Sequence, residues 1–322
     1  MIWSYSTHRE SRRCQRLLVL GHSMASAVAR DQDRREAYIL KQLQSIEQWQ
    51  GSVVHEVLAT DLLTPRVLAA QSLRTDLLIR SARDLARRQF SFSESRRYRE
   101  PGQTKTGAGT DYCALIDHER GQTVGQATLD GVDSTIVQCL TNLGKHSEIV
   151  RLIRGGSRHQ TESMHHFRLA PGLPLGMAML DLVFVSASGK TVIIDWKVTK
   201  GLGDYRQQML VYALAVTRST SWQSVGPDDV ELYEVNLLKD DVRRHQITRE
   251  MLDEAEDFVY GSLFELQALI DGRTYEDLDL NEFEIPEKPI ICQYCTLEPL
   301  CTRLLIEAGR PEAAVVIQGR LF

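Results

Sequence analysis

Two apolar segments in the middle of the chain predict a pair of neighbouring strands. Residues 177–185 and 191–198 are apolar and rich in β-branched side chains, and residues 186–190 between them have the composition of a turn. After a short loop, residues 204–218 have the apolar spacing of a helix. The pattern therefore predicts strand, turn, strand, loop and helix in this part of the chain.

The rest of the chain is mainly helical in pattern and adds two further strands. The expected helices are 32–62, 66–92, 131–154 and 248–271, and the expected additional strands are 165–170 and 230–238. This mixture predicts an α/β protein whose mixed sheet is flanked by helices. No apolar run approaches the length of a membrane-spanning helix, so none is expected.

Three charged residues interrupt the two central strands. Asp181 lies in the first strand, and Asp195 and Lys197 lie in the second. The two-residue period of a strand puts Asp195 and Lys197 on the same face. A carboxylate is rarely placed in a buried strand unless it is paired or binds a metal. Carboxylate oxygens suit Mg²⁺ or Mn²⁺, so the pattern predicts a site for a hard divalent cation. The alternative is a salt bridge between Asp195 and Lys197 at a sheet edge.

Two polar residues of the following helix share one face. Gln208 and Tyr212 are four positions apart, which places them one turn apart on helix 204–218. We expect this face to look back toward the ends of the two strands. Without the charged residues on those strands, the pair would indicate only a half-buried helix.

Cysteines form the second informative pattern. Three of them are close together in ICQYCTLEPLC and a fourth lies far upstream: Cys292, Cys295, Cys301 and Cys14. The start of the chain, MIWSYSTHRESRR, does not resemble a secretion signal, so we expect a cytoplasmic protein with reduced thiols. Clustered thiols then indicate a metal, and the spacing alone does not separate zinc from an iron–sulfur cluster. Cys113 and Cys139 are interpreted as ordinary buried thiols.

The motifs also occur in a recognisable order. The sequence contains, in turn, Cys14, GSVVH with Gly51 and His55, Asp181, Asp195-Trp196-Lys197, Gln208 with Tyr212, and the cysteine triplet. This order resembles the PD-(D/E)XK nucleases, in the RecB-like branch that carries an iron–sulfur cluster. That branch includes the small CRISPR-associated exonucleases and the AddB-type helicase–nuclease subunits. The resemblance covers most of the chain. One departure is Gln15, which stands where a proline usually follows the first cluster cysteine.

The resemblance implies how the cation would be held. His55, Asp181 and Asp195 would ligate the catalytic Mg²⁺ or Mn²⁺, together with the backbone carbonyl of Trp196. A lone histidine on a helix is more often a structural residue, and only the motif context makes His55 a ligand.

The resemblance also implies roles for the remaining motifs. Lys197 would orient the attacking water or stabilise the phosphate. Gln208 and Tyr212 would position the nucleic acid and the lysine. A [4Fe–4S] cluster would be held by Cys14, Cys292, Cys295 and Cys301.

The implied fold is a restriction-endonuclease-like core with a helical insertion and a closure of the chain by the iron–sulfur cluster. Residues 1–322 would form one nuclease domain. Its expected parts are 1–62 with the first cluster cysteine and the histidine helix, 63–164 as a mainly helical insertion, 165–240 as the catalytic core, and 241–322 as the C-terminal helix and cysteine triplet.

Charge distribution bears on the expected partner. The net charge of −5 argues against a uniformly basic nucleic-acid binder. Residues 1–100 nevertheless contain 17 Lys and Arg against 11 Asp and Glu, whereas residues 251–300 contain 2 against 13. A basic side that faces phosphates would fit DNA binding, and solvated helix faces explain the same runs.

One basic stretch suggests a path for DNA. Arg96, Arg97 and Arg99 surround Tyr98, which predicts phosphate contacts beside a stacking ring and a preference for single strands. The alternative is a solvent-exposed helix end.

These features predict a divalent-metal-dependent deoxyribonuclease, expected to act as an exonuclease on single-stranded DNA ends. Its setting would be DNA repair or recombination, CRISPR adaptation or antiphage defence. The alternative is a DNA-binding or scaffold subunit of a larger helicase–nuclease or defence complex with weak or conditional nuclease activity. The triplet Gly189-Lys190-Thr191 joins two strands and is therefore no nucleotide-binding loop, so any ATPase or helicase activity would come from a partner protein.

Overall fold

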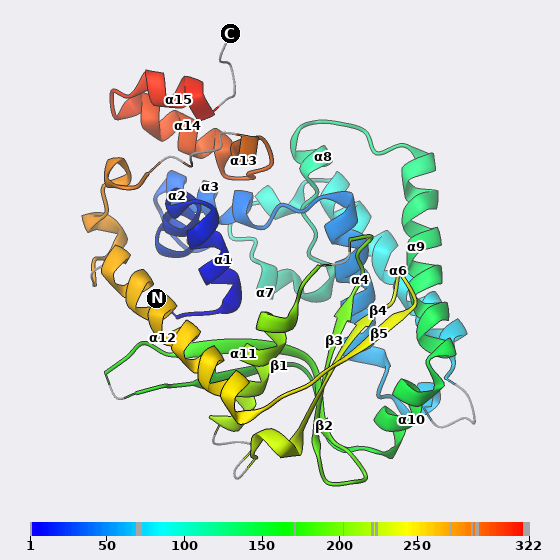
Figure 1. Ribbon diagram of the computed structural model, residues 1–322. Helices are drawn as coiled ribbons and strands as arrows, with labels where there is room; N and C mark the ends of the chain where they lie inside the picture. The colour runs from blue at the N-terminus through cyan, green and yellow to red at the C-terminus, as the bar shows by residue number, and fades with distance from the viewer. Residues whose placement is uncertain are drawn as a thin grey trace. The chain divides into compact units, whose positions relative to one another are not determined.

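The computed structural model describes residues 2–68, 73–170, 172–201, 203–219, 222, 225–270, 272–284, 286 and 290–317. The chain divides into two compact units, each assembled from separated segments. Unit 1 comprises residues 1–44, 92–121 and 262–322, and unit 2 comprises residues 45–91 and 122–261. The stretch 63–164 is therefore shared between the two units. Figure 1 labels the helices and strands and colours them by their position along the chain.

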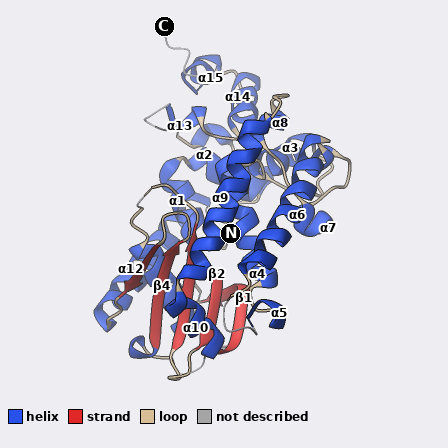
Figure 2. Cartoon of the chain, turned by 90° about the vertical axis from the view of Figure 1, so that its right-hand side faces the viewer, coloured by secondary structure: helices blue, strands red, loops and turns tan. Residues whose placement is uncertain are grey.

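A five-stranded mixed sheet forms the centre of unit 2. Its strands lie in the order β1-β2-β3-β4-β5, and neighbouring strands are antiparallel except for the parallel pair β3 and β4. Figure 2 shows these strands side by side. The strands are β1 Ser157–Phe167, β2 Gly176–Val185, β3 Thr191–Lys197, β4 Val230–Asn236 and β5 Asp241–His245.

Helices cover the sheet of unit 2. The parallel pair requires a crossover, which α11 supplies, and α11 packs against the first four strands. α4 packs against β1 and β2, and it also contacts α9. The helices are α4 Ile46–Asp61, α5 Pro65–Leu68, α6 Thr75–Glu94, α9 Gln126–Lys145, α10 Ser147–Gly155, α11 Arg206–Thr217 and α12 Arg249–Ile270, of which α6 and α12 continue into unit 1.

Unit 1 is helical in the part of the chain that the structure describes. Its buried core includes Leu20, Leu40 and Tyr98 together with Cys292 and Cys301. The α-helices are α1 Tyr5–Arg13, α2 Gln15–Leu18, α3 Gln32–Lys41, α7 Lys105–Ala108, α8 Ile116–Glu119, α13 Ile290–Gln293, α14 Glu298–Glu307 and α15 Pro311–Ile317, and a π-helix covers Val19–Met24. None of the described helices has both the length and the apolar character needed to cross a bilayer.

The predicted strands are confirmed at the centre of the sheet, but the predictions for its two edge strands are wrong. β2, β3 and β4 lie within two residues of the expected bounds. β1 begins at Ser157, well before the expected strand at 165–170, and β5 was not expected. Both are edge strands whose polar sequences lack an apolar run.

Two long predicted helices are each broken in the structure. The helix expected at 32–62 is interrupted after Lys41, because Gln44 forms a backbone bridge with Leu115 and Ser45 caps α4 by accepting from the backbone of Gln48. The helix expected at 131–154 is divided at His146 into α9 and α10. The helix expected at 66–92 is confirmed from Thr75 onward by α6, α5 covers its first residues, and residues 69–72 lie outside the described residues.

Candidate active site

Two carboxylates meet across the central strands. The antiparallel register pairs Leu182 with Ile194, and its continuation by one residue places Asp181 opposite Asp195. The backbone N–H of Trp196 donates a hydrogen bond of 2.7 Å to Asp181 Oδ2, which ties the two strands together at this point. Asp195 is 2 % exposed, so its carboxylate is held in the interior beside a second one.

Lys197 connects the carboxylates to α11. Its Nζ lies 2.7 Å from Asp195 Oδ2 and donates to Gln208 Oε1 at 3.2 Å. Gln208 Nε2 in turn donates to the hydroxyl oxygen of Tyr212 at 2.6 Å. The predicted approach of this helix face to the strand ends is therefore confirmed. The Asp195–Lys197 salt bridge of the alternative is present, but β3 is the central strand of the sheet, so the salt bridge does not lie at a sheet edge.

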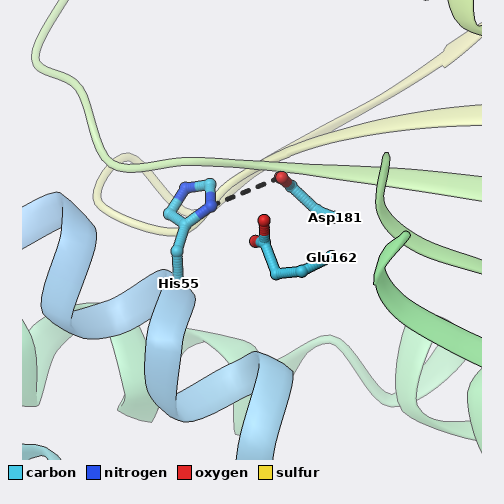
Figure 3. A group of neighbouring side chains, drawn as sticks. All are labelled: His55, Glu162 and Asp181. Atoms are coloured by element: carbon cyan, nitrogen blue, oxygen red, sulfur yellow. Dashed lines mark ion pairs between the residues drawn. The ribbon is translucent and has the colours of Figure 1, made fainter. Parts of the chain in front are cut away.

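His55 joins this group from α4. Its Nδ1 lies 3.5 Å from Asp181 Oδ2. One ligand atom each from His55, Asp181 and Glu162 lie within 4.8 Å of one another, and Figure 3 shows the three side chains pointing toward a common space. A nitrogen and carboxylate oxygens are donors that Mg²⁺ and Mn²⁺ accept, so the residues present fit a divalent cation.

Glu162 was missed by the sequence analysis. The β1–β2 register pairs Thr161 with Leu182 and Ser163 with Leu180, so Glu162 lies opposite Asp181 and on the same face. Its φ of 44° is in the left-handed region, which is unusual for a non-glycine residue within a strand. The segment SRHQTESMHHF has no apolar run to mark it as a strand, so the sequence offered no signal for this residue.

The row of ionisable residues continues on the other side of the site. β3 and β4 pair Asp195 with Glu234, and β4 and β5 pair Glu234 with Arg243. Glu234 is buried, and its carboxylate oxygens lie 3.0 Å from His245 Nε2 and 3.7 Å from Arg243 Nη1. Glu234 thus has Arg243 and His245 as its own partners, whereas Asp181 and Asp195 lie beside Lys197 and His55.

The electrostatics of the site favour a bound cation. Burial, followed by repulsion from Asp181, raises the pKa of Asp195 to about 7, although Lys197 and His55 act in the opposite direction. Burial acts to lower the pKa of His55, but the charge and hydrogen bond of Asp181 outweigh it and raise that pKa. Burial and the nearby carboxylates raise the pKa of Tyr212 well above its usual value, so its hydroxyl stays protonated. A cation bound beside these carboxylates would reduce the repulsion between Asp181 and Asp195.

Comparison with known proteins identifies the family. Residues 3–302 match the family model described as the PD-(D/E)XK nuclease superfamily. The chain belongs to this superfamily. Membership implies a metal-dependent nuclease that acts on nucleic acid, and hence a phosphodiesterase.

Other comparisons add little to this assignment. A search of curated proteins found no match. Among solved structures, the one titled "Crystal structure of SSO0001" is 15 % identical and covers 57 % of this chain and 77 % of its own, with a TM-score of 0.27. At that TM-score the likeness carries no argument about this PD-(D/E)XK chain.

Four cysteines of this PD-(D/E)XK chain surround one small cavity in unit 1. The cavity is lined by Cys14, Cys292, Cys295 and Cys301, with apolar neighbours that include Leu17 and Leu20. Among the described residues, no three of these sulfurs lie within 4.8 Å of one another. Burial is the main cause that raises the pKa of Cys292 and of Cys301 to about 11. The cysteines from the two ends of the chain thus meet at one place without forming a tight metal site by themselves.

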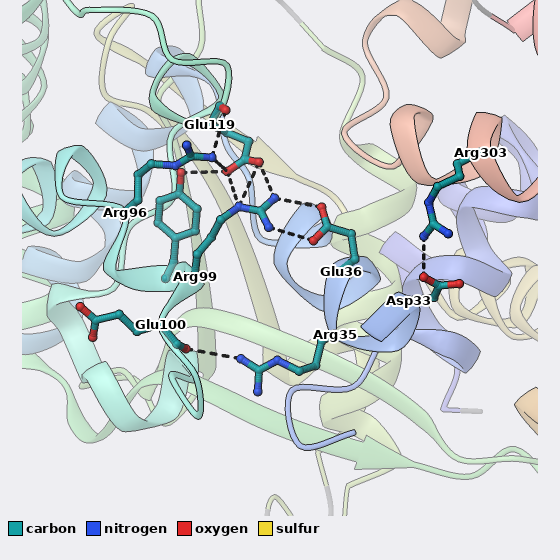
Figure 4. A network of polar contacts seen from close by, with 9 residues as sticks. Asp33, Arg35, Glu36, Arg96, Arg99, Glu100, Glu119 and Arg303 are labelled. Atoms are coloured by element: carbon teal, nitrogen blue, oxygen red, sulfur yellow. Dashed lines mark hydrogen bonds and ion pairs between the residues drawn. The ribbon is translucent and has the colours of Figure 1, made fainter. Parts of the chain in front are cut away.

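The basic segment at residues 96–99 makes several contacts within unit 1. Tyr98 is fully buried, and its hydroxyl donates to Glu119 Oε2 at 3.0 Å, so its ring is not available for stacking. Arg99 donates to both Glu36 and Glu119, and Arg96 donates to Glu119 (Figure 4). The stacking role predicted for Tyr98 is therefore wrong, whereas DNA binding by Arg96, Arg97 and Arg99 stays a prediction.

Proposed function

We propose that this chain is a divalent-metal-dependent deoxyribonuclease that trims single-stranded DNA ends. The observation that carries the proposal is the convergence of His55, Glu162 and Asp181 beside the pair Asp195–Lys197. These groups come from a helix and three strands, and a cluster of titratable groups with shifted pKa values is typical of functional sites. Partner proteins with helicase or ATPase activity, in repair, CRISPR adaptation or antiphage defence, would supply such ends.

The proposed metal site uses four side chains of unit 2. Mg²⁺ or Mn²⁺ would be held by His55, Glu162, Asp181 and Asp195, with the backbone carbonyl of Trp196 as a further ligand. When bound, the cation supplies positive charge that polarises a phosphate oxygen and lowers the pKa of a water molecule. Without a cation, two neighbouring carboxylates on adjacent central strands destabilise the fold, which favours an enzyme over a scaffold that has lost its activity.

The proposed role of Lys197 follows from the way its ammonium is held. Asp195 lies on one side, Gln208 on another, and the ring centre of Tyr205 lies 4.2 Å from Nζ. These contacts fix a positive charge in place before the substrate arrives. A fixed charge stabilises the negative charge that develops on the phosphate and does not need to reorganise during the reaction. Tyr212 holds Gln208 and so acts as a positioning residue.

We also propose that the four cysteines hold a [4Fe–4S] cluster with a structural role. The proposal is supported by the cavity that they share and by the motif order of the sequence. Cys14 lies near the start of the chain and Cys301 near its end, so a bound cluster would close unit 1 and stabilise it.

The first test measures cleavage of end-labelled DNA and its metal dependence. Single-stranded DNA, double-stranded DNA and RNA are incubated with the protein in Mg²⁺, Mn²⁺, Ca²⁺ or EDTA. We expect single-stranded DNA to be shortened from an end in Mg²⁺ or Mn²⁺ and only poorly in Ca²⁺, because Ca²⁺ prefers longer distances and looser geometry. Full cleavage in excess EDTA would exclude the mechanism, and binding without cleavage in every metal would favour the scaffold function.

A second prediction concerns Glu162. Replacing Glu162 with Gln removes one anionic donor, and we expect Mn²⁺ to bind at least about tenfold more weakly, since even residues that only support metal ligands contribute this much. Isothermal titration calorimetry with Mn²⁺ measures the change without DNA. The matched control is Glu148→Gln, which alters an exposed carboxylate of α10. Unchanged Mn²⁺ affinity in Glu162→Gln would remove this residue from the site.

A further inference from the structure

Arg16 is a buried cation whose charge has no acidic partner in the described part of the chain. The residue is 1 % exposed and lies in the short helix α2, two positions after Cys14. Its Nε donates to the backbone carbonyl of Phe283 at 2.9 Å, but Nη1 and Nη2 have no hydrogen-bond partner among the described residues. A buried guanidinium without a counter-charge destabilises a protein, so its retention needs a reason.

The surroundings of Arg16 indicate what that reason is. Arg16 lines the same cavity as the four cysteines, and its charge acts on the thiol of Cys301, where it opposes the effect of burial. Thiols bind metals as thiolates, and four thiolates around one metal centre carry a net negative charge. An anion of this kind in the cavity would be the counter-charge that Arg16 otherwise lacks.

A competing location for an anion is less suitable. Arg16 also lines a second cavity of about 240 Å³, whose other lining residues include Leu278, Leu305 and Asp279. The carboxylate of Asp279 would repel an anion there. Glu298 lines the cysteine cavity, but its Oε1 accepts a hydrogen bond from the Thr302 hydroxyl at 2.7 Å, and no ion pair with Arg16 occurs in the described part of the chain.

We propose that Arg16 is the built-in counter-charge of an anionic metal–thiolate centre held by Cys14, Cys292, Cys295 and Cys301. This inference rests on the proposed cluster and adds a residue that does not ligate the metal. The guanidinium neutralises the centre and offers Nη hydrogen bonds to its sulfur atoms. Hydrogen bonds and charge next to such sulfurs are among the features that set how firmly a cluster is held and how readily it is reduced.

Arg16 also has a structural contact, and the two roles predict different results. The Nε hydrogen bond to Phe283 would stabilise the protein equally with and without metal. A counter-charge role stabilises only the metal-loaded form, because the unpaired guanidinium destabilises the metal-free form. The difference between the two forms therefore separates the roles.

The experiment compares Arg16→Met and Arg16→Lys with the unchanged protein, all prepared without oxygen. Iron release to a chelator is followed by the loss of cluster absorbance, and thermal unfolding is measured with and without the cluster. We expect Arg16→Met to release iron about tenfold faster, as for other residues that support metal ligands. Arg16→Lys, which keeps the charge, should restore most of the retention. Arg12→Met, which removes an exposed arginine of α1, should behave as the unchanged protein.

The loaded and metal-free forms should respond differently to Arg16→Met. The melting temperature of the loaded protein should fall, and that of the metal-free protein should stay the same or rise. An equal fall in both forms, or unchanged iron release, would overturn the proposal. If the protein contains zinc in place of iron, the iron–sulfur cluster is refuted. The counter-charge role of Arg16 is then tested by measuring zinc release from the same variants. An unchanged protein that binds no metal through these thiols would refute both.

Discussion

Replacing Lys197 with methionine is expected to slow DNA cleavage by about 10²- to 10³-fold while the protein keeps its fold and its affinity for metal. The methionine retains most of the apolar stem but removes the ammonium that lies between Asp195 and Gln208. Loss of one preorganised charge or donor at a developing negative charge typically lowers a rate by about 10²- to 10³-fold. The rate should be measured in single turnover with saturating single-stranded DNA, and Mn²⁺ affinity by calorimetry.

Two further variants make this result interpretable. Lys200→Met removes an exposed lysine just beyond β3 and should leave the rate unchanged. Asp195→Asn should slow cleavage as much as Lys197→Met but should also bind Mn²⁺ more weakly, because it removes a ligand charge. If purified Lys197→Met and Asp195→Asn both cleave at the original rate, the active site has been assigned to the wrong residues.

The central part of the site was predictable because its residues violate a pattern. Asp181 and Asp195 stand in apolar strands, where an uncompensated charge is costly, and this anomaly is visible in the sequence. The four-residue spacing of Gln208 and Tyr212 gave the helix face in the same way. Each of these residues lies on an element whose period is clear, so the face it occupies follows from the spacing.

Glu162 could not be found by the same reasoning. It lies among polar residues on an edge strand, where a charged side chain is ordinary and marks nothing. Its importance comes from pairing with Asp181 across β1 and β2, and register between strands is a tertiary property. β5 was missed for a related reason, since its short sequence DVRRH is mostly charged.

The stacking role predicted for Tyr98 failed because the local sequence does not show which distant residues surround the ring. Three arginines around a tyrosine look free to bind phosphate when the sequence is read locally. Glu36 and Glu119, which bind Arg99, lie far from it in the sequence, and only the fold brings them together. Tyr98 likewise is buried by residues that its own segment does not contain. A charged run predicts a binding surface only when its counter-charges are known.

Replacing Cys14 with serine should damage the protein as much as replacing Cys292 with serine. Cys14 lies near the start of the chain and Cys292 near its end. If one cluster binds both residues, loss of either ligand removes the same link between the two ends of unit 1. We expect the unchanged protein, purified without oxygen, to be brown and to contain about four irons per chain. Both serine variants should lose most of this iron and unfold at a lower temperature, as measured by iron analysis and thermal denaturation.

The matched controls are the two cysteines outside the cavity. Burial raises the pKa of Cys113 and of Cys139 to about 12, so both stay protonated and are poor metal ligands. Alanine is the suitable replacement there, because serine would place a hydroxyl in a fully buried site. Cys113→Ala and Cys139→Ala should keep the full iron content. Equal iron loss in the controls and in Cys14→Ser would mean that iron retention reports general stability, and the four cysteines would then no longer be distinguished as ligands.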